Sequence, residues 1–308
     1  MKTLVVVNPK AGHGRIRLHW PRHEKVLRDI LHEPEVVFTE QRGHAAELTR
    51  KALLEGYERI VSVGGDGTHH EVVNGFFNQA MPINPNATLG ILPAGTGSDL
   101  ARTLGLSSFR QGLEVLASGK AFGADVGRVQ FTSHNGEQSL MHFINVADFG
   151  AGGAVAARVN RSSKRFGGFA SYLWAVVRTL LTFKNPRVHL EIDGECLEQR
   201  CNNVIIANGQ YYGGGMHVAP EASLTSGHFE IFVIGDVTRR EAFQNLPRLY
   251  RGTLKERPDL VRYFCARQIK ADSDEEVLLN LDGEQPGRLP AVVQTLPSAL
   301  LVIAPGRR

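Results

Sequence analysis

The N-terminal third of the chain alternates short apolar runs with longer segments in which apolar residues recur every three or four positions. The short runs are typical of buried strands and the longer recurrences are typical of helices. The predicted strands lie near residues 3–7, 35–38, 59–63 and 88–92, and the predicted helices near 15–32, 43–55, 68–79 and 109–118. This alternation predicts an α/β N-terminal domain built on a doubly wound parallel sheet.

The pattern changes after Gly119. The following segments are rich in β-branched residues or alternate in polarity, and Gly or Asn often separates them. They predict a C-terminal, mainly antiparallel β-sandwich domain with helices. The strands are expected near 124–132, 139–147, 187–193, 201–208, 228–235, 261–270 and 276–282, and the helices near 151–183 and 239–251. The two domains are therefore predicted to cover 1–122 and 123–295.

Three of the first strands run directly into glycine turns that carry polar residues. These turns contain Asn8, Pro9 and Gly12; Gly64, Gly65, Asp66, Gly67 and Thr68; and Gly95, Thr96, Gly97, Ser98 and Asp99. Glycine lets backbone amides approach an anion closely, and a helix that begins near Thr68 would direct its first amides at a phosphate. Because the carboxyl ends of parallel strands meet at one edge of a sheet, the three turns predict a phosphate-binding site there.

Two carboxylates in these turns are candidates for the chemistry. Asp66 would repel a phosphate, so it is expected to hold the Mg²⁺ that accompanies a nucleotide or to take a proton from a hydroxyl. Its alternative role is to close the turn. Asp99 either supports Asp66 or the substrate hydroxyl, or it caps a helix. The chain contains neither a G-x-x-x-x-G-K-[ST] loop nor the protein-kinase motifs.

Composition restricts the class of protein. The 308 residues are 42% hydrophobic and 21% charged, as in an ordinary globular protein, and three cysteines without a C-x-x-C pair argue against a disulfide framework or a zinc site. The segment Phe166–Phe183 carries Arg178, so it is not expected to span a membrane. We expect a cytoplasmic protein. The segment from Thr238 to Lys270 contains nine basic residues and three acidic ones. This cluster is either a solvated helix face or a contact for an anionic bilayer, and nucleic-acid binding is not expected.

Five motifs occur in order over nearly the whole chain. They are Asn8-Pro9 with Gly12, the run Gly64–Thr68, the segment Pro93–Arg102, Ala219-Pro220 with Gly227, and Asp282-Gly283-Glu284. Together they resemble the diacylglycerol kinase catalytic family, in particular its small soluble bacterial lipid kinases, to which sphingosine and ceramide kinases are related. The resemblance implies ATP and Mg²⁺ as cofactors and transfer of the γ-phosphate to a lipid hydroxyl. Diacylglycerol is the first expected substrate, and a sphingoid base or ceramide is the second.

The resemblance also implies further properties of the molecule. The run Ala299–Ala304 is expected to return so that about 296–308 completes the first domain. The lipid substrate would be met at a membrane surface during transient peripheral association, and a homodimer is one candidate assembly.

Roles for individual residues follow from the same resemblance. It implies that Thr39, the turn Gly65–Glu71 and Thr96 contact ATP, that the Asn8-Pro9 loop borders the nucleotide, and that Asp66 contacts Mg²⁺–ATP. Glu284 is the implied base for the acceptor hydroxyl and Asp282 its orienting partner, with Asp66 as the alternative base. His69 and His70 follow the glycine turn, and we expect them to line the nucleotide pocket or to face solvent.

One departure from the family pattern affects a second metal site. In the bacterial relatives an Asp binds a structural Mg²⁺ together with backbone carbonyls, and Ser226 stands in its place here. The carbonyls of Ser223 and His228 remain, but without the charged ligand the site is not expected to bind an ion tightly.

Two rival functions stay open. One is a soluble-substrate kinase of the NAD-kinase type, which shares the Gly-Asp-Gly turn, and the other is a non-catalytic lipid-binding protein with a degenerate kinase site.

Overall fold

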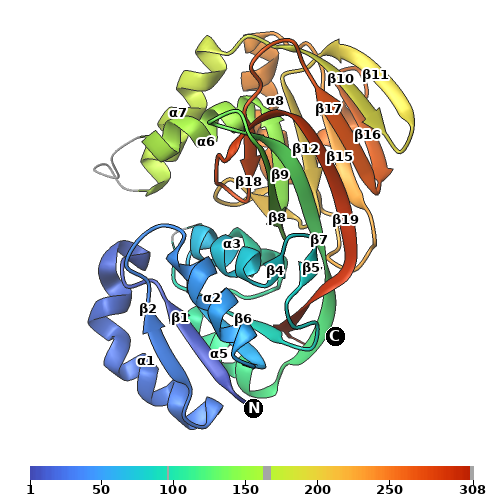
Figure 1. The fold of residues 1–308 in the computed structure, drawn as a ribbon. Coiled ribbons are helices and arrows are strands. Elements are labelled where there is room, and N and C mark those ends of the chain that lie inside the picture. The colour runs from blue at the N-terminus through green and yellow to red at the C-terminus, as the bar shows by residue number, and fades with distance from the viewer. Residues whose placement is uncertain (96, 162–167, 306–308) are drawn as a thin grey trace. The chain divides into compact units, whose positions relative to one another are not determined.

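Two units make up the structure, a computed structural model that describes residues 1–95, 97–161 and 168–305 (Figure 1). Unit 1 contains Met1–Val126 and Pro297–Arg308, and unit 2 contains Gly127–Leu296. The chain passes from one unit to the other within two strands, β7 (Lys120–Ser133) and β19 (Gly287–Ala304).

A parallel sheet forms the centre of unit 1. Its strands run in the order β2, β1, β3, β6 and the C-terminal part of β19, where Leu301 and Val302 pair with β6. The strands are β1 (Thr3–Val7), β2 (Glu35–Phe38), β3 (Arg59–Gly64) and β6 (Thr88–Pro93). β1 lies between β2 and β3, so the chain reverses direction across the sheet between β1 and β3. Open α/β sheets bind their ligands at the carboxyl edge of such a reversal.

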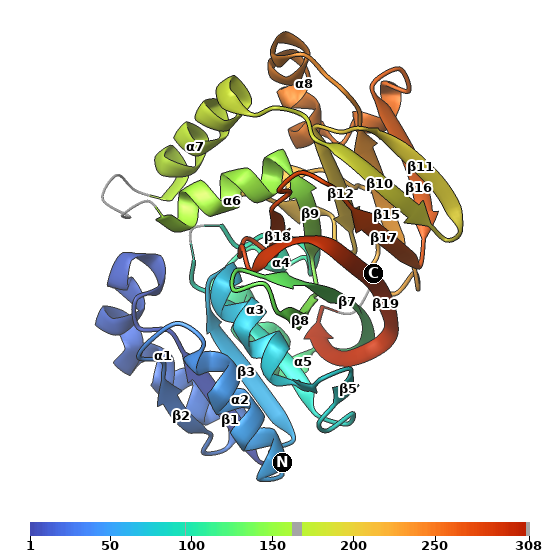
Figure 2. The ribbon, with the colours of Figure 1, turned by 45° about the horizontal axis from the view of Figure 1, so that its top comes forward.

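Helices of unit 1 alternate with these strands as predicted. They are α1 (Arg15–Leu31), α2 (His44–Leu54), α3 (Asp66–Gly75), α4 (Asp99–Thr103) and α5 (Phe109–Ser118), with a 3₁₀ turn η1 (Ala11–Gly14) before α1. α1 contacts α5 and α2 contacts α3 (Figure 2). The predicted helix 68–79 was wrong at both ends. The helix starts at Asp66, and it stops at Gly75 because Phe77 leaves it to pair with Pro82 in the two-stranded sheet of β4 (Phe77–Asn78) and β5 (Met81–Pro82).

Unit 2 contains two sheets. One is an antiparallel sheet in the order β16, β15, β12, β9, β18, and the other has the order β11, β10, β17, β19 with β7 and β8 beside it. The strands are β8 (Gln138–Phe143), β9 (Val146–Gly150), β10 (Arg187–Ile192), β11 (Glu195–Arg200), β12 (Asn203–Ala207), β15 (Phe229–Ile234), β16 (Val261–Ala266), β17 (Gln268–Asp272) and β18 (Leu279–Leu281). A short hairpin of β13 (Tyr211–Tyr212) and β14 (Met216–His217) lies outside both sheets.

Both sheets of unit 2 contribute side chains to one apolar core. Phe131 and Phe143 come from β7 and β8, Phe149 and Phe229 come from the five-stranded sheet, and all four are at most 2% exposed. Two sheets packed face to face over such a core form a β-sandwich. The predicted fold class, a parallel α/β unit followed by a mainly antiparallel sandwich with helices, is therefore confirmed.

In the part of unit 2 that the structure describes, three helices accompany the sandwich. They are α6 (Ala151–Arg161), α7 (Gly168–Thr182) and α8 (Arg239–Arg251), and a 3₁₀ turn η3 (Leu254–Glu256) follows α8. The region predicted as a helix over 151–183 thus contains two helices, and Phe166 and the other residues of 162–167 lie outside the described residues. α8 has the predicted bounds because Thr238 and Glu241 form a capping box at its start and Gly252 (φ 70°) ends it. Among the described residues, no helix is long and apolar enough to cross a membrane.

Two predicted strands of unit 2 proved to be pairs of strands. The segment 139–147 is divided between β8 and β9, and 261–270 is divided between β16 and β17, which belong to different sheets. Neither segment contains a Gly or Pro that would show where the chain leaves one sheet for the other. β11 and the first part of β19 were not predicted.

The sandwich contains one fully buried acid. The side chain of Asp148 on β9 lies between Ile205 and Asn280 of the neighbouring strands, and Asn280 donates a hydrogen bond of 3.1 Å to its Oδ2. Within the described part of the chain, its Oδ1 has no hydrogen-bond partner. Burial raises the pKa of Asp148 from 3.8 to about 7, although the bond from Asn280 acts in the opposite direction. The folded protein therefore keeps a proton on Asp148 that the unfolded chain loses.

This difference predicts how stability depends on pH. The contribution of Asp148 is fully present below pH 3.8 and is lost as the pH rises through about 7. Asp148→Asn retains the contact with Asn280 without a charge. Its unfolding free energy relative to wild type should rise by roughly 2–3 kcal/mol between about pH 5 and pH 8, because each unit of pKa corresponds to about 1.4 kcal/mol. Urea unfolding at the two pH values measures this change. The exposed Asp274→Asn is the control, and equal pH dependence in both variants would contradict the prediction.

Candidate active site

The loops after β1, β2 and β3 meet at the carboxyl edge of the parallel sheet. The amide of Asn8 donates to the carbonyl of Val63 at 2.9 Å, and its Nδ2 donates to Oγ1 of Thr68 at 3.0 Å. The amide of Thr39 donates to the carbonyl of Val7 at 2.8 Å. Asn8, Thr39 and Thr68, each predicted to contact or border the nucleotide, therefore lie on adjoining loops.

Glycines bring the three glycine turns, which follow β1, β3 and β6, into direct backbone contact. A Cβ placed on Gly95 would lie 2.5 Å from the Cα of Gly65, and one on Gly12 would lie 2.8 Å from the carbonyl oxygen of Ala94. A Cβ on Gly64 would lie 2.5 Å from the side chain of Thr68. No real Cβ tolerates such distances, so glycine is required at Gly12 and Gly95 for the turns to touch and at Gly64 for its own turn to close.

The N-terminus of α3 opens into this junction. Gly65 precedes the first helical residue, and no side chain caps the helix. Gly67, in the first turn, has no side chain that would cover the neighbouring amides. The first amides of a helix lack partners within the helix and carry partial positive charge, so they suit the oxygens of a polyphosphate.

Asp66 occupies the first position of α3 and joins two turns. Its Oδ1 accepts a hydrogen bond of 3.2 Å from the amide of Leu100. Its Oδ2 lies so close to Gly97 that a Cβ there would be 2.6 Å away. Any other residue at Gly97 would thus fill the space in front of this oxygen. A carboxylate oxygen beside an open backbone suits Mg²⁺, so the residues present fit the metal of a Mg²⁺–nucleotide.

Asp99 is buried at the start of α4 and stabilises the third turn. Its Oδ1 accepts a bond of 2.6 Å from Nη1 of Arg102, which also donates to the carbonyl of Gly97. Oγ of Ser98 donates to the carbonyl of Gly95 at 3.3 Å. Arg102 lies in one of the recognised motifs, but no role was predicted for it. Thr96, predicted to contact ATP, lies outside the described residues.

The carboxylate of Glu71 binds the start of α2. Its Oε1 accepts from the amide of Gly43 at 2.8 Å and its Oε2 accepts from the amide of Ala45 at 3.2 Å. With both oxygens engaged by amides, Glu71 positions α2 beside α3. Its implied contact with ATP stays a prediction.

Neither histidine after the glycine turn faces solvent. His69 and His70 are 1% and 3% exposed, so the expectation that allowed them to face solvent was wrong. Both lie on the side of α3 that packs into unit 1. Nδ1 of His69 is 2.7 Å from Oγ of Ser62, and burial lowers the pKa of His69 to about 4. His69 is therefore neutral near pH 7, and its contact with Ser62 connects α3 to β3.

In unit 2, Asp282 fixes a hairpin that carries Glu284. The carboxylate of Asp282 accepts three backbone hydrogen bonds, from Ile144 at 2.9 Å, Asn145 at 3.0 Å and Val146 at 2.9 Å. Leu281 and Glu284 exchange backbone bonds of 2.8 and 2.9 Å across the turn. Asp282 is thus a positioning residue, which is compatible with its predicted part as the partner of Glu284. No role was predicted for Asn145.

The loop that holds Ser226 does not fit a structural cation. Oγ of Ser226 lies 3.0 Å from the carbonyl oxygen of Ser223 and 2.8 Å from that of His228. These are the two carbonyls that the family resemblance assigned to the metal, and here the hydroxyl occupies the space between them. Across the described residues, no group of three or more His, Cys, Asp or Glu side chains is arranged to hold a metal ion.

The contact between the glycine turns predicts a graded response to alanine. Gly95→Ala places its Cβ 2.5 Å from the Cα of Gly65, whereas Gly65→Ala places its Cβ 3.2 Å from the Cα of Gly95. Gly95→Ala should weaken binding of Mg²⁺–ATP by roughly tenfold or more, and Gly65→Ala by less, because an overlap of this kind forces backbone shifts. Isothermal titration calorimetry measures both affinities.

A glycine of unit 2 provides the control for these variants. A Cβ on Gly235 would meet only the carbonyl oxygen of Leu260, at 3.6 Å, and Gly235→Ala should bind the nucleotide as wild type does. Unchanged affinity in Gly95→Ala, at an unchanged melting temperature, would show that the junction does not bind the nucleotide.

Comparison with known proteins identifies the family to which the chain is similar. The family model of the diacylglycerol kinase catalytic domain matches residues 2–129, and the model of the YegS C-terminal NAD kinase beta sandwich-like domain matches residues 145–304. A diacylglycerol kinase of Bacillus subtilis (strain 168) is 27% identical over 98% of this chain and 95% of its own length. One from Staphylococcus carnosus (strain TM300) is 26% identical, with coverages of 98% and 94%.

Solved structures show the same fold. A crystal structure of a diacylglycerol kinase from Bacillus anthracis strain Sterne covers 98% of this chain and 96% of its own, with a TM-score of 0.73 and 22% identity. A second crystal structure from that strain reaches a TM-score of 0.79 at 23% identity. The predicted resemblance is thereby confirmed, and the chain belongs to the diacylglycerol kinase family, with a catalytic domain followed by a YegS-type β-sandwich domain.

Proposed function

We propose that this protein transfers the γ-phosphate of Mg²⁺–ATP to the hydroxyl group of a lipid, with diacylglycerol as the first candidate and a sphingoid base or ceramide as the second. The family is one of lipid kinases, and its relatives that align over the whole chain are named diacylglycerol kinase. The observation that carries the proposal is the junction of three glycine turns at the uncapped N-terminus of α3.

Phosphoryl transfer requires positioning and charge neutralisation more than covalent chemistry from the protein. In this proposal the backbone of Gly64–Thr68 and of the Gly95–Asp99 turn binds the polyphosphate. Asp66 would hold Mg²⁺, which when bound neutralises charge on the phosphates. Arg102 forms an ion pair with Asp99 and neutralises its charge. Asp99 therefore adds no uncompensated negative charge beside the phosphate oxygens.

Proton removal from the acceptor hydroxyl is assigned to Glu284. The hairpin that carries it is fixed by the three amide bonds to Asp282, so its backbone position is well determined. A positioned carboxylate can accept the proton as the oxygen attacks the γ-phosphorus. Asp66 is the alternative base.

The two rival functions are less well supported. A kinase for NAD draws support from the description of the second family model, which likens the sandwich to that of NAD kinases. The catalytic-domain model and the named relatives favour a lipid substrate instead. A non-catalytic lipid-binding protein has little support, because Asp66 and the glycines of the junction are all present.

Transfer of labelled γ-phosphate to a panel of acceptors tests the substrate class. With Mg²⁺ present, label should enter diacylglycerol, sphingosine or ceramide and should not enter NAD. Label in NAD alone would establish the soluble-substrate alternative, and absence of ATP consumption with tight lipid binding would establish the non-catalytic one.

Replacement of the proposed base tests the catalytic assignment. Glu284→Gln should lower kcat by roughly a hundredfold and leave KM for ATP nearly unchanged, because a general base contributes to the chemical step. The matched control is Glu276→Gln, an exposed glutamate paired with Arg288 at 3.6 Å, which should retain the wild-type rate. A Glu284→Gln enzyme with the parent rate would transfer the role of base to Asp66.

A further inference from the structure

α7 presents large apolar side chains to solvent. Trp174 is 65% exposed, Leu181 is 50% exposed and Leu173 is 43% exposed. Trp174, Arg178 and Leu181 are spaced four and three residues apart, so they lie on one face of the helix. Single exposed apolar residues are common on protein surfaces, but a cluster on one helix face marks an interaction site.

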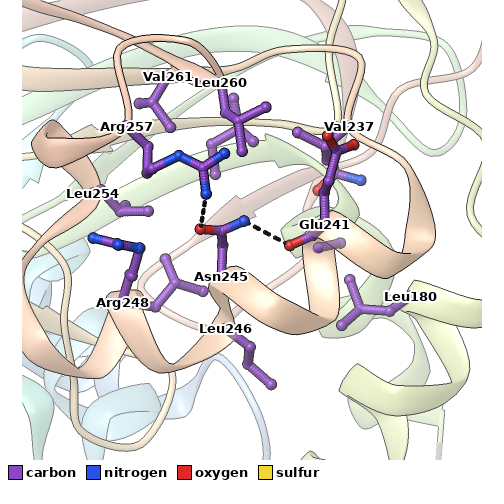
Figure 3. Close-up of a pocket in the computed structure, with 14 residues that line it drawn as sticks. Leu180, Val237, Glu241, Asn245, Leu246, Arg248, Leu254, Arg257, Leu260 and Val261 are labelled. Atoms are coloured by element: carbon purple, nitrogen blue, oxygen red, sulfur yellow. Dashed lines mark hydrogen bonds between the residues drawn. The ribbon is translucent and has the colours of Figure 1, made fainter.

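Packing of the opposite face of α7 fixes this orientation. Ala175 and Val176 are buried against Val155 of α6, and Leu180 packs toward Leu246 of α8 in the same apolar cluster (Figure 3). The helix therefore already has a well-packed buried side. Its outward apolar residues cannot enter that cluster without exposing the residues that form it.

α8, which contacts α7, presents several arginines to solvent. Arg240, Gln244, Pro247 and Arg251 are exposed at helical spacing along one side, and Arg239 is exposed beside them. Glu241, the acidic residue of the first turn, is engaged in the capping box with Thr238.

Other arginines of this region are already neutralised. Arg248 pairs with Glu256 at 2.8 Å and Arg257 pairs with Asp259 at 2.7 Å. Among the described residues, by contrast, no ion pair involves the arginines at 178, 239, 240 and 251. The surface formed by α7 and α8 therefore has an uncompensated positive charge.

The cavity under α8 does not explain these features. It has a volume of about 70 Å³ and an apolar lining that includes Val237, Leu246, Leu249 and Leu260 (Figure 3). This space accommodates at most a few small molecules such as water, so it is no site for a lipid chain. The unexplained feature is the outer surface of the two helices.

We propose that the outward faces of α7 and α8 dock onto an anionic lipid bilayer. The docking surface consists of Leu173, Trp174, Arg178, Leu181, Arg239, Arg240 and Arg251. Trp174 and the two leucines would enter the boundary between headgroups and acyl chains, where tryptophan is favoured, and the arginines would contact anionic headgroups. The choice of a bilayer as the partner rests on the proposed function.

Charge complementarity selects the bilayer over a second copy of the chain. Two copies that met through this surface would bring their uncompensated arginines together, and like charges across an interface oppose association. A negatively charged bilayer offers both an apolar layer for Trp174 and counter-charges for the arginines.

The two tryptophans of the chain permit a direct test. Trp20 is 6% exposed in unit 1, so Trp174 is the residue whose fluorescence should respond to a membrane. Trp20→Phe leaves Trp174 as the sole reporter. On vesicles of phosphatidylcholine mixed with phosphatidylglycerol, its emission should shift to shorter wavelength and be quenched by lipids brominated in their acyl chains. Trp174→Phe, which retains Trp20, should show neither effect.

Charge reversal tests the basic part of the surface. Arg239→Glu/Arg240→Glu should weaken vesicle binding by roughly tenfold or more, since each cation near an anionic surface contributes measurably. Arg22→Glu/Lys25→Glu makes the same change of charge on the exposed side of α1 and is the matched control, expected to bind as wild type. Circular dichroism checks that all variants are folded.

Three results would overturn the docking proposal. One is absence of wild-type binding to the anionic vesicles. Another is binding that is unaffected by the changes at Trp174, Arg239 and Arg240. The third is a dimer in light scattering that Trp174→Glu dissociates, which would make a second copy the occupant.

Failure of docking can be told apart from failure of the proposed function. Charge reversal at Arg239 and Arg240 should leave phosphate transfer to a dispersed short-chain diacylglycerol unchanged and reduce transfer to diacylglycerol in vesicles. Vesicle binding without phosphorylation of any lipid would refute the function and retain the surface. Phosphorylation with binding that is insensitive to these substitutions would refute the surface and retain the function.

Discussion

Backbone contact between Gly65 and Gly95 is the constraint on which the site in unit 1 depends. The two turns follow neighbouring parallel strands, and a single added methyl group at Gly95 would lie 2.5 Å from the other backbone. Their approach allows Asp66 to receive the amide of Leu100, and that bond holds the start of α4 against the start of α3. The geometry of this junction is therefore preorganised by the backbone, and side chains such as Asp66 connect the turns.

Several carboxylates of the molecule connect backbone segments in this way. Glu71 binds two amides at the start of α2, Asp282 binds three amides of the β8–β9 turn, and Asp99 is neutralised by Arg102. Charged hydrogen bonds of this kind are stronger than neutral ones and fix loops that have few apolar contacts. A family motif can thus contain an acid, such as Asp282, whose observed role is to hold neighbouring backbone segments in place.

Much of the fold could be predicted from local patterns. The bounds of β1, β2, α5 and α8 follow from hydrophobic period and capping residues, all of which are local. The break between β8 and β9 could not be predicted, because it is fixed by Asp282, which lies 138 residues away in sequence from Ile144. Long-range contacts of this kind leave no periodic signal.

The convergence of the glycine turns was predictable in the same way. Turns that follow neighbouring parallel strands lie together because such strands end at one edge of the sheet. Whether Glu71 faces ligand or α2, and whether His69 faces solvent or the core, depends on how α3 is packed. The lack of a charged side chain at Ser226 was visible in the sequence, but the two contacts of its hydroxyl with carbonyl oxygens were not.

Hydrogen–deuterium exchange with and without Mg²⁺–ATP shows whether the glycine turns bind the nucleotide. If the three turns and the first amides of α3 bind the triphosphate, exchange should slow in the peptides that cover residues 8–14, 64–70 and 94–100 and change little in the strands of the sandwich. Unchanged exchange in all three peptides at a saturating nucleotide concentration, or protection confined to other segments, would show that these turns do not bind the triphosphate.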